Sequence, residues 1–94
     1  MELAPGNPEA CNALGSVYMA AGSYSAAEAQ FAKALESDST RAEILYNLGR
    51  AREAQGDLDA TVDAYEAFFR HWRGPETARV QDLKRHLKAL KQGD

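Results

Sequence analysis

The side chains that most often carry out catalysis are few in this chain, and none of them stands in a catalytic arrangement. The 94 residues include a single cysteine, Cys11, and two histidines, His71 and His86. Nucleophilic catalysis needs a base within reach of the nucleophile, and a zinc site needs cysteine or histidine ligands at short, regular spacings. The sequence contains neither pattern and no glycine-rich phosphate loop. We therefore expect a protein that is not an enzyme and that needs no metal and no cofactor.

The remaining residues with reactive or stacking side chains have simpler structural explanations. Cys11 lies where its predicted helix needs an apolar residue, so we expect it to be buried rather than reactive. His71 lies near the end of a predicted helix, where a histidine interacts favourably with the helix dipole. Trp72 either stacks on a ligand or covers the seam between the fourth and fifth helices, and the second interpretation is favoured. We expect all three residues to serve the fold.

The elements that would position a binding site follow from a repeat. Residues recur at a spacing of 34, in the pairs Leu14-Gly15 and Leu48-Gly49, Gly22 and Gly56, Tyr24 and Leu58, and Phe31 and Tyr65. Self-similarity at this period predicts stacked helix-turn-helix units. In the first unit two helical faces are expected to pack together, one made of Cys11, Leu14 and Tyr18 and the other of Ala27, Phe31 and Ala34.

The recurring glycines have two different predicted roles. Gly15 and Gly49 fall inside helices, where glycine costs roughly 1 kcal/mol relative to alanine, so we expect each to admit a second helix at close range. In the first unit that approach is expected at Ala27. Gly22 and Gly56 fall where the first helix of each unit must end, and we expect the left-handed conformation that closes a helix.

These residues resemble the tetratricopeptide repeat family over about residues 8 to 74. The family pattern falls on Cys11, Leu14-Gly15, Tyr18, Gly22, Ala27, Phe31 and Ala34, and again on Leu45, Leu48-Gly49, Arg52, Gly56, Thr61, Tyr65 and Phe68. Arg52, Thr61 and Phe68 depart from it, so we expect the second unit to pack less regularly. The resemblance implies an all-α fold, a right-handed α-solenoid of two antiparallel helix pairs plus a fifth capping helix.

The expected organisation has four parts. Residues 1–7 are the remnant of a preceding repeat or a native N-terminal tail, residues 8–41 and 42–74 are the two repeats, and residues 75–94 form the capping helix and a short tail. Helices are predicted at about 8–21, 25–37, 41–55 and 60–72, with a fifth that starts at 74–76. The expected N-terminal caps are Asn7 with Pro8, the capping boxes Ser25–Glu28 and Thr40–Glu43, and Asp59.

The fifth helix has a clear predicted task. Val80, Leu83, Leu87 and Leu90 form one apolar stripe along it. The last pair of a repeat array otherwise leaves its apolar face in water, and here that face holds Tyr65, Phe68 and Phe69. We therefore expect the fifth helix to be required for folding.

The net charge of −3 hides an uneven distribution. Residues 1–69 carry eleven acidic and four basic side chains, −7 in total, whereas residues 70–94 carry three acidic and seven basic side chains, +4 in total. The favoured interpretation is a basic terminal helix that lies on an acidic body. A nucleic-acid or membrane-surface patch is disfavoured because the chain as a whole is acidic. The chain contains no signal-peptide pattern and no transmembrane stretch, so a cytoplasmic location is favoured.

The resemblance implies that the first helix of each pair lines a concave face that binds peptides. The candidate groove residues are Asn12, Ser16, Met19, Tyr46, Asn47, Arg50, Glu53, Gln81, Lys84 and Lys88. Asn47 stands where the family often has an asparagine that holds a peptide backbone. Asn12 and Ser16 do not match the carboxylate clamp of relatives that bind chaperone tails, so we do not expect such a receptor. The alternative is that Asn47 and Arg50 belong to an ordinary solvated face.

The favoured function is a protein-interaction module that binds a peptide of a partner protein. Because Arg50, Lys84 and Lys88 are basic, we expect that peptide to be acidic or to present its free C-terminus. One alternative is self-assembly as a weak homodimer through the outer face of the first helix, which includes Ala10, Val17 and Ala21. The other alternative is an accessory segment of a larger enzyme. Nucleic-acid and membrane partners are not expected.

Overall fold

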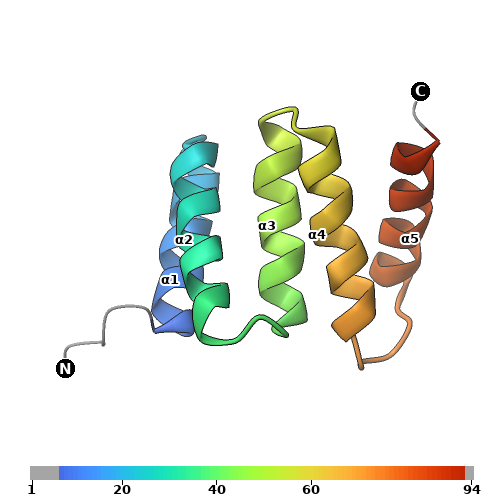
Figure 1. The fold of residues 1–94 in the computed structure, drawn as a ribbon, viewed down its shortest axis with the longest axis horizontal. Coiled ribbons are helices and arrows are strands. Elements are labelled where there is room, and N and C mark those ends of the chain that lie inside the picture. Colours follow the sequence, from blue (N-terminus) through green and yellow to red (C-terminus); the bar gives the residue numbers. More distant parts are fainter. Residues whose placement is uncertain (1–6, 93–94) are drawn as a thin grey trace.

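The structure is a computed structural model that describes residues 7–92, and these residues form five α-helices and no strand. The helices are α1 (Pro8–Ala20), α2 (Tyr24–Ser37), α3 (Ala42–Ala54), α4 (Leu58–His71) and α5 (Ala78–Lys91). Two antiparallel pairs, α1–α2 and α3–α4, stand side by side, and α5 closes the row at the C-terminal end (Figure 1). The all-α prediction is confirmed. The segment predicted to be the remnant of a repeat lies, apart from Asn7, outside the described residues.

The two helices of each pair cross where the first helix carries a glycine. A Cβ atom on Gly15 would lie 2.5 Å from Cε1 of Phe31, and one on Gly49 would lie 2.6 Å from Cδ1 of Tyr65. The close approach predicted at these glycines is therefore confirmed. The atoms nearest to these glycines belong to aromatic rings, Phe31 in the first pair, rather than to Ala27, where the approach was expected.

The turns inside the two pairs share one geometry. Gly22 has a φ angle of 79° and Gly56 one of 82°, in the left-handed region that glycine adopts without strain. The amide of Ser23 donates to the carbonyl of Tyr18, and the amide of Asp57 donates to that of Arg52. Both glycines thus close their helices as predicted.

The predicted N-cap of α1 is confirmed, and the predicted N-cap of α4 is displaced by two residues. Asn7 caps α1, because its Oδ1 accepts from the amide of Ala10 at 3.0 Å and Pro8 opens the helix. α4 is capped by Asp57 through the amide of Ala60, so the prediction of Asp59 was wrong by two residues. The tight turn at Gly56 brings the chain into the helix earlier than the pattern indicated.

The two predicted capping boxes do not form. α2 begins at Tyr24, so Ser25 already lies inside the helix, and Glu28 turns instead to Arg52 of α3 at 3.0 Å. α3 begins after Arg41, and the hydroxyl of Thr40 donates to Asp38 rather than to the helix. The side chains that the capping boxes need are bound elsewhere, Glu28 by Arg52 of α3 and Thr40 by Asp38 in the preceding turn.

The start of α5 also differs from the prediction. The helix was expected to open at Gly74, Pro75 and Glu76, but it begins at Ala78. Thr77 is its N-cap and accepts from the amide of Val80 at 3.3 Å. The preceding segment is taken up by a turn in which Trp72 donates its indole N–H to the carbonyl of Pro75.

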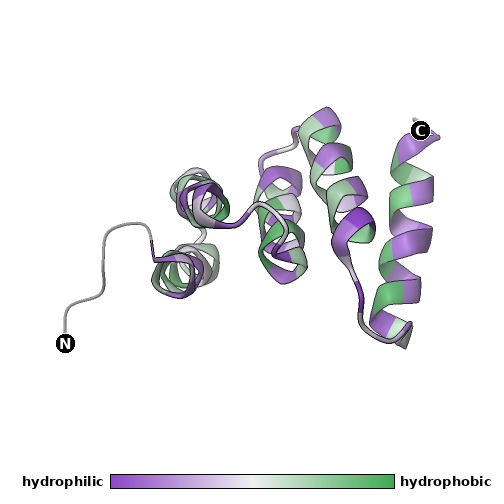
Figure 2. Cartoon of the chain, turned by 60° about the horizontal axis from the view of Figure 1, so that its bottom comes forward, coloured by the Kyte–Doolittle hydropathy of each residue, from purple (hydrophilic) through white to green (hydrophobic). Residues whose placement is uncertain are grey.

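The core forms two adjoining clusters. The first joins α1 and α2 to α3 and to Ala64 of α4, and contains Cys11, Ala27, Phe31, Ala34, Ile44, Leu48, Ala51 and Ala64. The second joins α3, α4 and α5 and contains Leu45, Tyr65, Phe68, Val80, Leu83 and Leu87. Cys11 is buried, as predicted. Figure 2 shows the corresponding division of each helix into hydrophobic and hydrophilic sides.

Thr61, one of the residues that depart from the family pattern, is fully buried and donates its hydroxyl to the carbonyl of Asp57 at 2.7 Å. The expected packing of Leu14 against α2 was wrong. Leu14 does not face α2 but is 41% exposed, whereas its equivalent Leu48 is 5% exposed. Leu48 faces the first pair, and among the described residues no helix pair stands on the corresponding side of Leu14.

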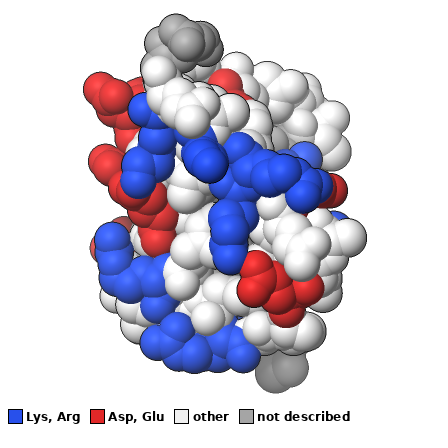
Figure 3. Space-filling view, turned by 90° about the vertical axis from the view of Figure 1, so that its right-hand side faces the viewer, with Lys and Arg blue, Asp and Glu red and all other residues white. Residues whose placement is uncertain are grey.

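The basic fifth helix is tied to the acidic body by charged side chains. Lys91 pairs with Glu66 of α4 at 2.7 Å, and Nε2 of His86 lies 2.5 Å from a carboxylate oxygen of Glu53 on α3. The end view in Figure 3 shows Lys and Arg side chains gathered over the outer face of the α5 end, with acidic side chains at its margins. The favoured interpretation of the charge asymmetry thus agrees with these contacts.

Candidate binding site

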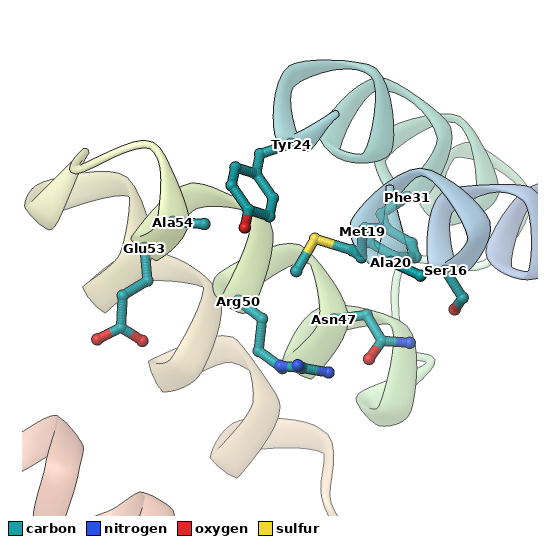
Figure 4. A pocket seen from close by; sticks show the side chains of 9 residues that line it. All are labelled: Ser16, Met19, Ala20, Tyr24, Phe31, Asn47, Arg50, Glu53 and Ala54. Atoms are coloured by element: carbon teal, nitrogen blue, oxygen red, sulfur yellow. The ribbon is translucent and has the colours of Figure 1, made fainter. Parts of the chain in front are cut away.

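A cavity of about 530 Å³ lies between the first helix pair and α3 (Figure 4). Its lining comes from α1, α2 and α3 and consists of Ser16, Met19, Ala20, Tyr24, Phe31, Asn47, Arg50, Glu53 and Ala54. We call it the α1–α3 cavity. Its size falls in the range of ordinary ligand pockets, which is about 300–1,000 Å³. Five of the predicted groove residues therefore meet in one place.

The position of Asn47 is fixed by a residue of the first helix. Its Nδ2 donates to Oδ1 of Asn12 at 2.9 Å, so the two predicted asparagines form one unit across α1 and α3. This bond uses one donor of Asn47 and leaves its carbonyl oxygen with no protein partner in residues 7–92. An amide group held in this way can accept a backbone N–H from a ligand.

Arg50 is the cation of the α1–α3 cavity. Its guanidinium lies 5.8 Å from the ring centroid of Tyr46, a cation–π arrangement, and it forms no ion pair within the described part of the chain. In Figure 4 the side chains of Arg50 and Asn47 extend from α3 toward the same side of the cavity. The five N–H donors of an arginine make this side chain suited to a carboxylate.

Glu53 does not compete for Arg50, although both residues line the same cavity. Its carboxylate accepts from the hydroxyl of Tyr65 at 2.9 Å and also contacts His86. Burial, and after it the hydrogen bond to the Glu53 carboxylate, raises the pKa of Tyr65 above its usual value. The phenol therefore stays protonated and continues to donate to Glu53, which points away from Arg50 in Figure 4.

The other predicted groove residues lie outside this cavity. Tyr46 lies one helical turn before Arg50 on α3, but its ring contacts Tyr65 and Phe68 and does not line this cavity. Lys84 pairs with Glu76 at 2.6 Å and lies over the ring of Phe69 on α4. Gln81 and Lys88 are exposed on α5 and do not line the cavity. α5 packs mainly against α4, so the surface of α3 does not continue onto these three residues of α5.

Four residues that line the cavity were not among the predicted groove residues: Ala20, Tyr24, Phe31 and Ala54. Tyr24 is the most informative of them, because it is the first residue of α2 and faces Met19 across the cavity (Figure 4). The sequence could have indicated this position, because the short turn at Gly22 keeps the first side chain of α2 close to the end of α1.

The comparison with known families agrees with this architecture. Residues 15–56 match the family model described as TPR repeat. This stretch runs from the crossing glycine of α1 to the turn glycine after α3, and over it the chain is similar to the tetratricopeptide repeat. Repeats of this family generally mediate protein–protein interaction and are typically non-catalytic. No curated protein matches the chain.

Residues 7–92 contain neither a candidate metal cluster nor a helix that could span a membrane. No group of three or more histidine, cysteine or acidic side chains in these residues is placed to hold a metal ion. In the same part of the chain no helix is long and apolar enough to cross a membrane.

Proposed function

We propose that this chain is a non-catalytic module that binds a peptide segment of a partner protein in the α1–α3 cavity. The observation that carries the proposal is the pairing of an asparagine held in place by Asn12 with an unpaired arginine, Arg50, in a single cavity. Asn47 is one helical turn from Arg50 on α3, so both side chains can contact the same short stretch of peptide.

The chemistry of the cavity favours an acidic ligand. Asn47 would accept a backbone N–H, which holds any extended peptide regardless of sequence. Arg50 would pair with a carboxylate, either an acidic side chain or the free C-terminus. Met19 and Tyr24 supply the apolar part of the contact. Because a peptide covers little surface in a cavity of this size, we expect a dissociation constant in the micromolar range, equivalent to about −8 kcal/mol.

Reversal of the charge at Arg50 tests this function. Arg50→Glu should weaken the binding of acidic peptides about tenfold or more, because one charge-assisted contact is replaced by repulsion. The measurement is a titration of peptides selected from a random library, with helix content followed by circular dichroism. Lys33→Glu is the matched control, since Lys33 is exposed on α2 and lies outside the cavity. Enrichment of basic or purely apolar peptides would contradict the proposal, as would equal effects of the two variants.

A second candidate function is self-association through the outer face of α1. Val17 is 62% exposed and Leu14 is exposed beside it, whereas their equivalents Leu48 and Ala51 are buried against the first pair. The only charged residue of α1 is Glu9, and it is held by Arg41 at 2.9 Å. Two copies of this uncharged face would therefore meet without charge repulsion, in a weak two-fold dimer.

Val17→Glu should abolish this contact. A buried carboxylate without a partner is unfavourable, so we expect the dimer dissociation constant to rise at least about tenfold while helix content stays constant. Sedimentation velocity over a concentration series measures the change. Ala29→Glu, at an exposed position of α2, serves as the control. A protein that stays monomeric at millimolar concentration, or a dimer that tolerates Val17→Glu, would rule out this interface.

A further inference from the structure

A second cavity, of about 400 Å³, lies between α3, α4 and α5. Its lining is mainly aromatic and aliphatic and consists of Glu43, Tyr46, Phe68, Trp72, Pro75, Thr77, Arg79, Val80 and Leu83. We call it the α3–α5 cavity. None of its residues except Tyr46 was among the predicted groove residues.

The aromatic wall of the α3–α5 cavity is held in place by several contacts. The rings of Phe68 and Trp72 are stacked, with centroids 5.3 Å apart and an interplanar angle of 20°. Tyr46 lies 6.1 Å from Phe68, and the indole N–H of Trp72 is fixed by the carbonyl of Pro75 at 3.2 Å. A preformed apolar wall of this kind suits a bulky apolar side chain, because the protein's own side chains are already ordered before the ligand binds.

The charges at the rim of this cavity are unequal. Glu43 is partly neutralised, because Nη2 of Arg41 lies 3.3 Å from its carboxylate. Arg79 is exposed and forms no ion pair or side-chain hydrogen bond within residues 7–92. The neighbouring Glu76, which could have paired with it, is bonded to Lys84. The unpaired charge beside the aromatic wall is therefore positive, and the complementary ligand group is a carboxylate.

The two cavities are close enough for a single ligand. Tyr46 lines the α3–α5 cavity, and Arg50, which lies over the Tyr46 ring, lines the α1–α3 cavity. Along α3 the seven positions from Glu43 to Arg50 correspond to about 10 Å at 1.5 Å per residue. About three residues of an extended peptide cover this distance.

We propose that the α3–α5 cavity is an anchor site for the peptide ligand, and that it takes one bulky apolar side chain next to an acidic residue. The apolar side chain, from phenylalanine, leucine or methionine, packs on Tyr46, Phe68 and Trp72, and the adjacent carboxylate pairs with Arg79. A second acidic group, about three residues away, reaches Arg50. This inference rests on the proposed peptide-binding function, to which it adds the sequence pattern of the ligand.

Trp72 gives this proposal a direct spectroscopic test, because it is the single tryptophan of the chain and lines the α3–α5 cavity. The probes are tryptophan-free peptides from the random library, each compared with a version whose apolar anchor is changed to alanine and a version whose neighbouring acid is changed to its amide. We expect the parent peptide to shift or quench the Trp72 emission, and the alanine version to lose this change.

Charge reversal on the protein completes the experiment. Arg79→Glu should weaken the parent peptide about tenfold and should leave the amide version nearly unaffected. A glutamate in the first turn of α5 is favourable for the helix, so loss of binding would not reflect unfolding. Arg85→Glu, farther along the exposed side of α5, is the control for a general change in charge.

The outcomes separate this inference from the function on which it rests. Peptides that depend on Arg50 but leave Trp72 emission and the Arg79→Glu variant unaffected would overturn the anchor site and leave the α1–α3 cavity as the binding site. Peptides that depend on Arg79 and Trp72 but not on Arg50 would support the anchor site and overturn the role of the α1–α3 cavity. A library that yields no binding peptide would overturn both.

Discussion

Leu83→Ala is expected to lower the free energy of unfolding by about 2–5 kcal/mol, the range for large-to-small changes at buried leucines. Leu83 is 8% exposed and packs in the cluster that includes Leu45, Tyr65 and Phe68. Small domains are stable by only about 5–15 kcal/mol in total, so this single change would remove a large part of the stability. The effect is expected because α5 covers aromatic residues that are otherwise exposed to water.

Chemical denaturation of the variant, followed by circular dichroism, measures the change. Gln81→Ala on the same helix is the control, since Gln81 is exposed and its replacement should change stability by no more than about 0.5 kcal/mol. A chain truncated after Gly74 should be unfolded or should aggregate. If that truncated chain melted cooperatively near the temperature of the intact protein, the requirement for α5 would be refuted.

Gly49→Ala is expected to destabilise the protein by about 1–3 kcal/mol through overpacking. Within a helix, replacement of glycine by alanine normally stabilises by about 1 kcal/mol because alanine has the higher helix propensity. The sign of the measured change therefore shows whether overpacking or helix propensity dominates. The added methyl group would lie far inside contact distance of the Tyr65 ring, and that ring cannot move easily because it is buried and its hydroxyl is bonded to Glu53. Sterics should therefore outweigh helix propensity.

A double-mutant cycle with Tyr65→Leu isolates this contact. The cost of Gly49→Ala should shrink in the Tyr65→Leu background, because the ring atoms that meet the new methyl group are gone. Gly15→Ala should behave in the same way, since its methyl group would meet Phe31. A stabilisation of about 1 kcal/mol by Gly49→Ala in the unmodified background would show that the helices of the second pair separate easily, contrary to the packing described above.

The sequence by itself determined the features that depend on local periodicity. The 34-residue repeat predicted the helix pairs, and Gly22 and Gly56 predicted the turns within them. The apolar stripe of α5 predicted which residues would be buried, because side chains three and four positions apart necessarily share a helical face. The cap at Asn7 was also predictable, since it involves only residues next to each other in the chain.

Interactions between helices were decided by the tertiary structure alone. Glu28 was expected to cap its own helix but pairs with Arg52 of α3, and Glu53 was expected to face a ligand but accepts from Tyr65 of α4 and contacts His86 of α5. Spacing along one helix gives the face on which a side chain lies, but it does not give the angle and offset at which the next helix packs. The α1–α3 cavity therefore brings together predicted groove residues of α1 and α3, whose register follows from the repeat, and none of α5.

The sequence also does not show which arginines lack an ion-pair partner and can therefore bind a ligand. Nothing in the sequence distinguishes Arg50 and Arg79, which have no ion-pair partner in residues 7–92, from Arg41 and Arg52, which do. Arg41 pairs with Glu9 and Arg52 pairs with Glu28, both far away in the sequence, and such a pair forms only when the packing of the helices brings the two side chains within about 4 Å. The sequence thus determined which groups can bind a ligand, and the tertiary structure determined which of them are free to do so.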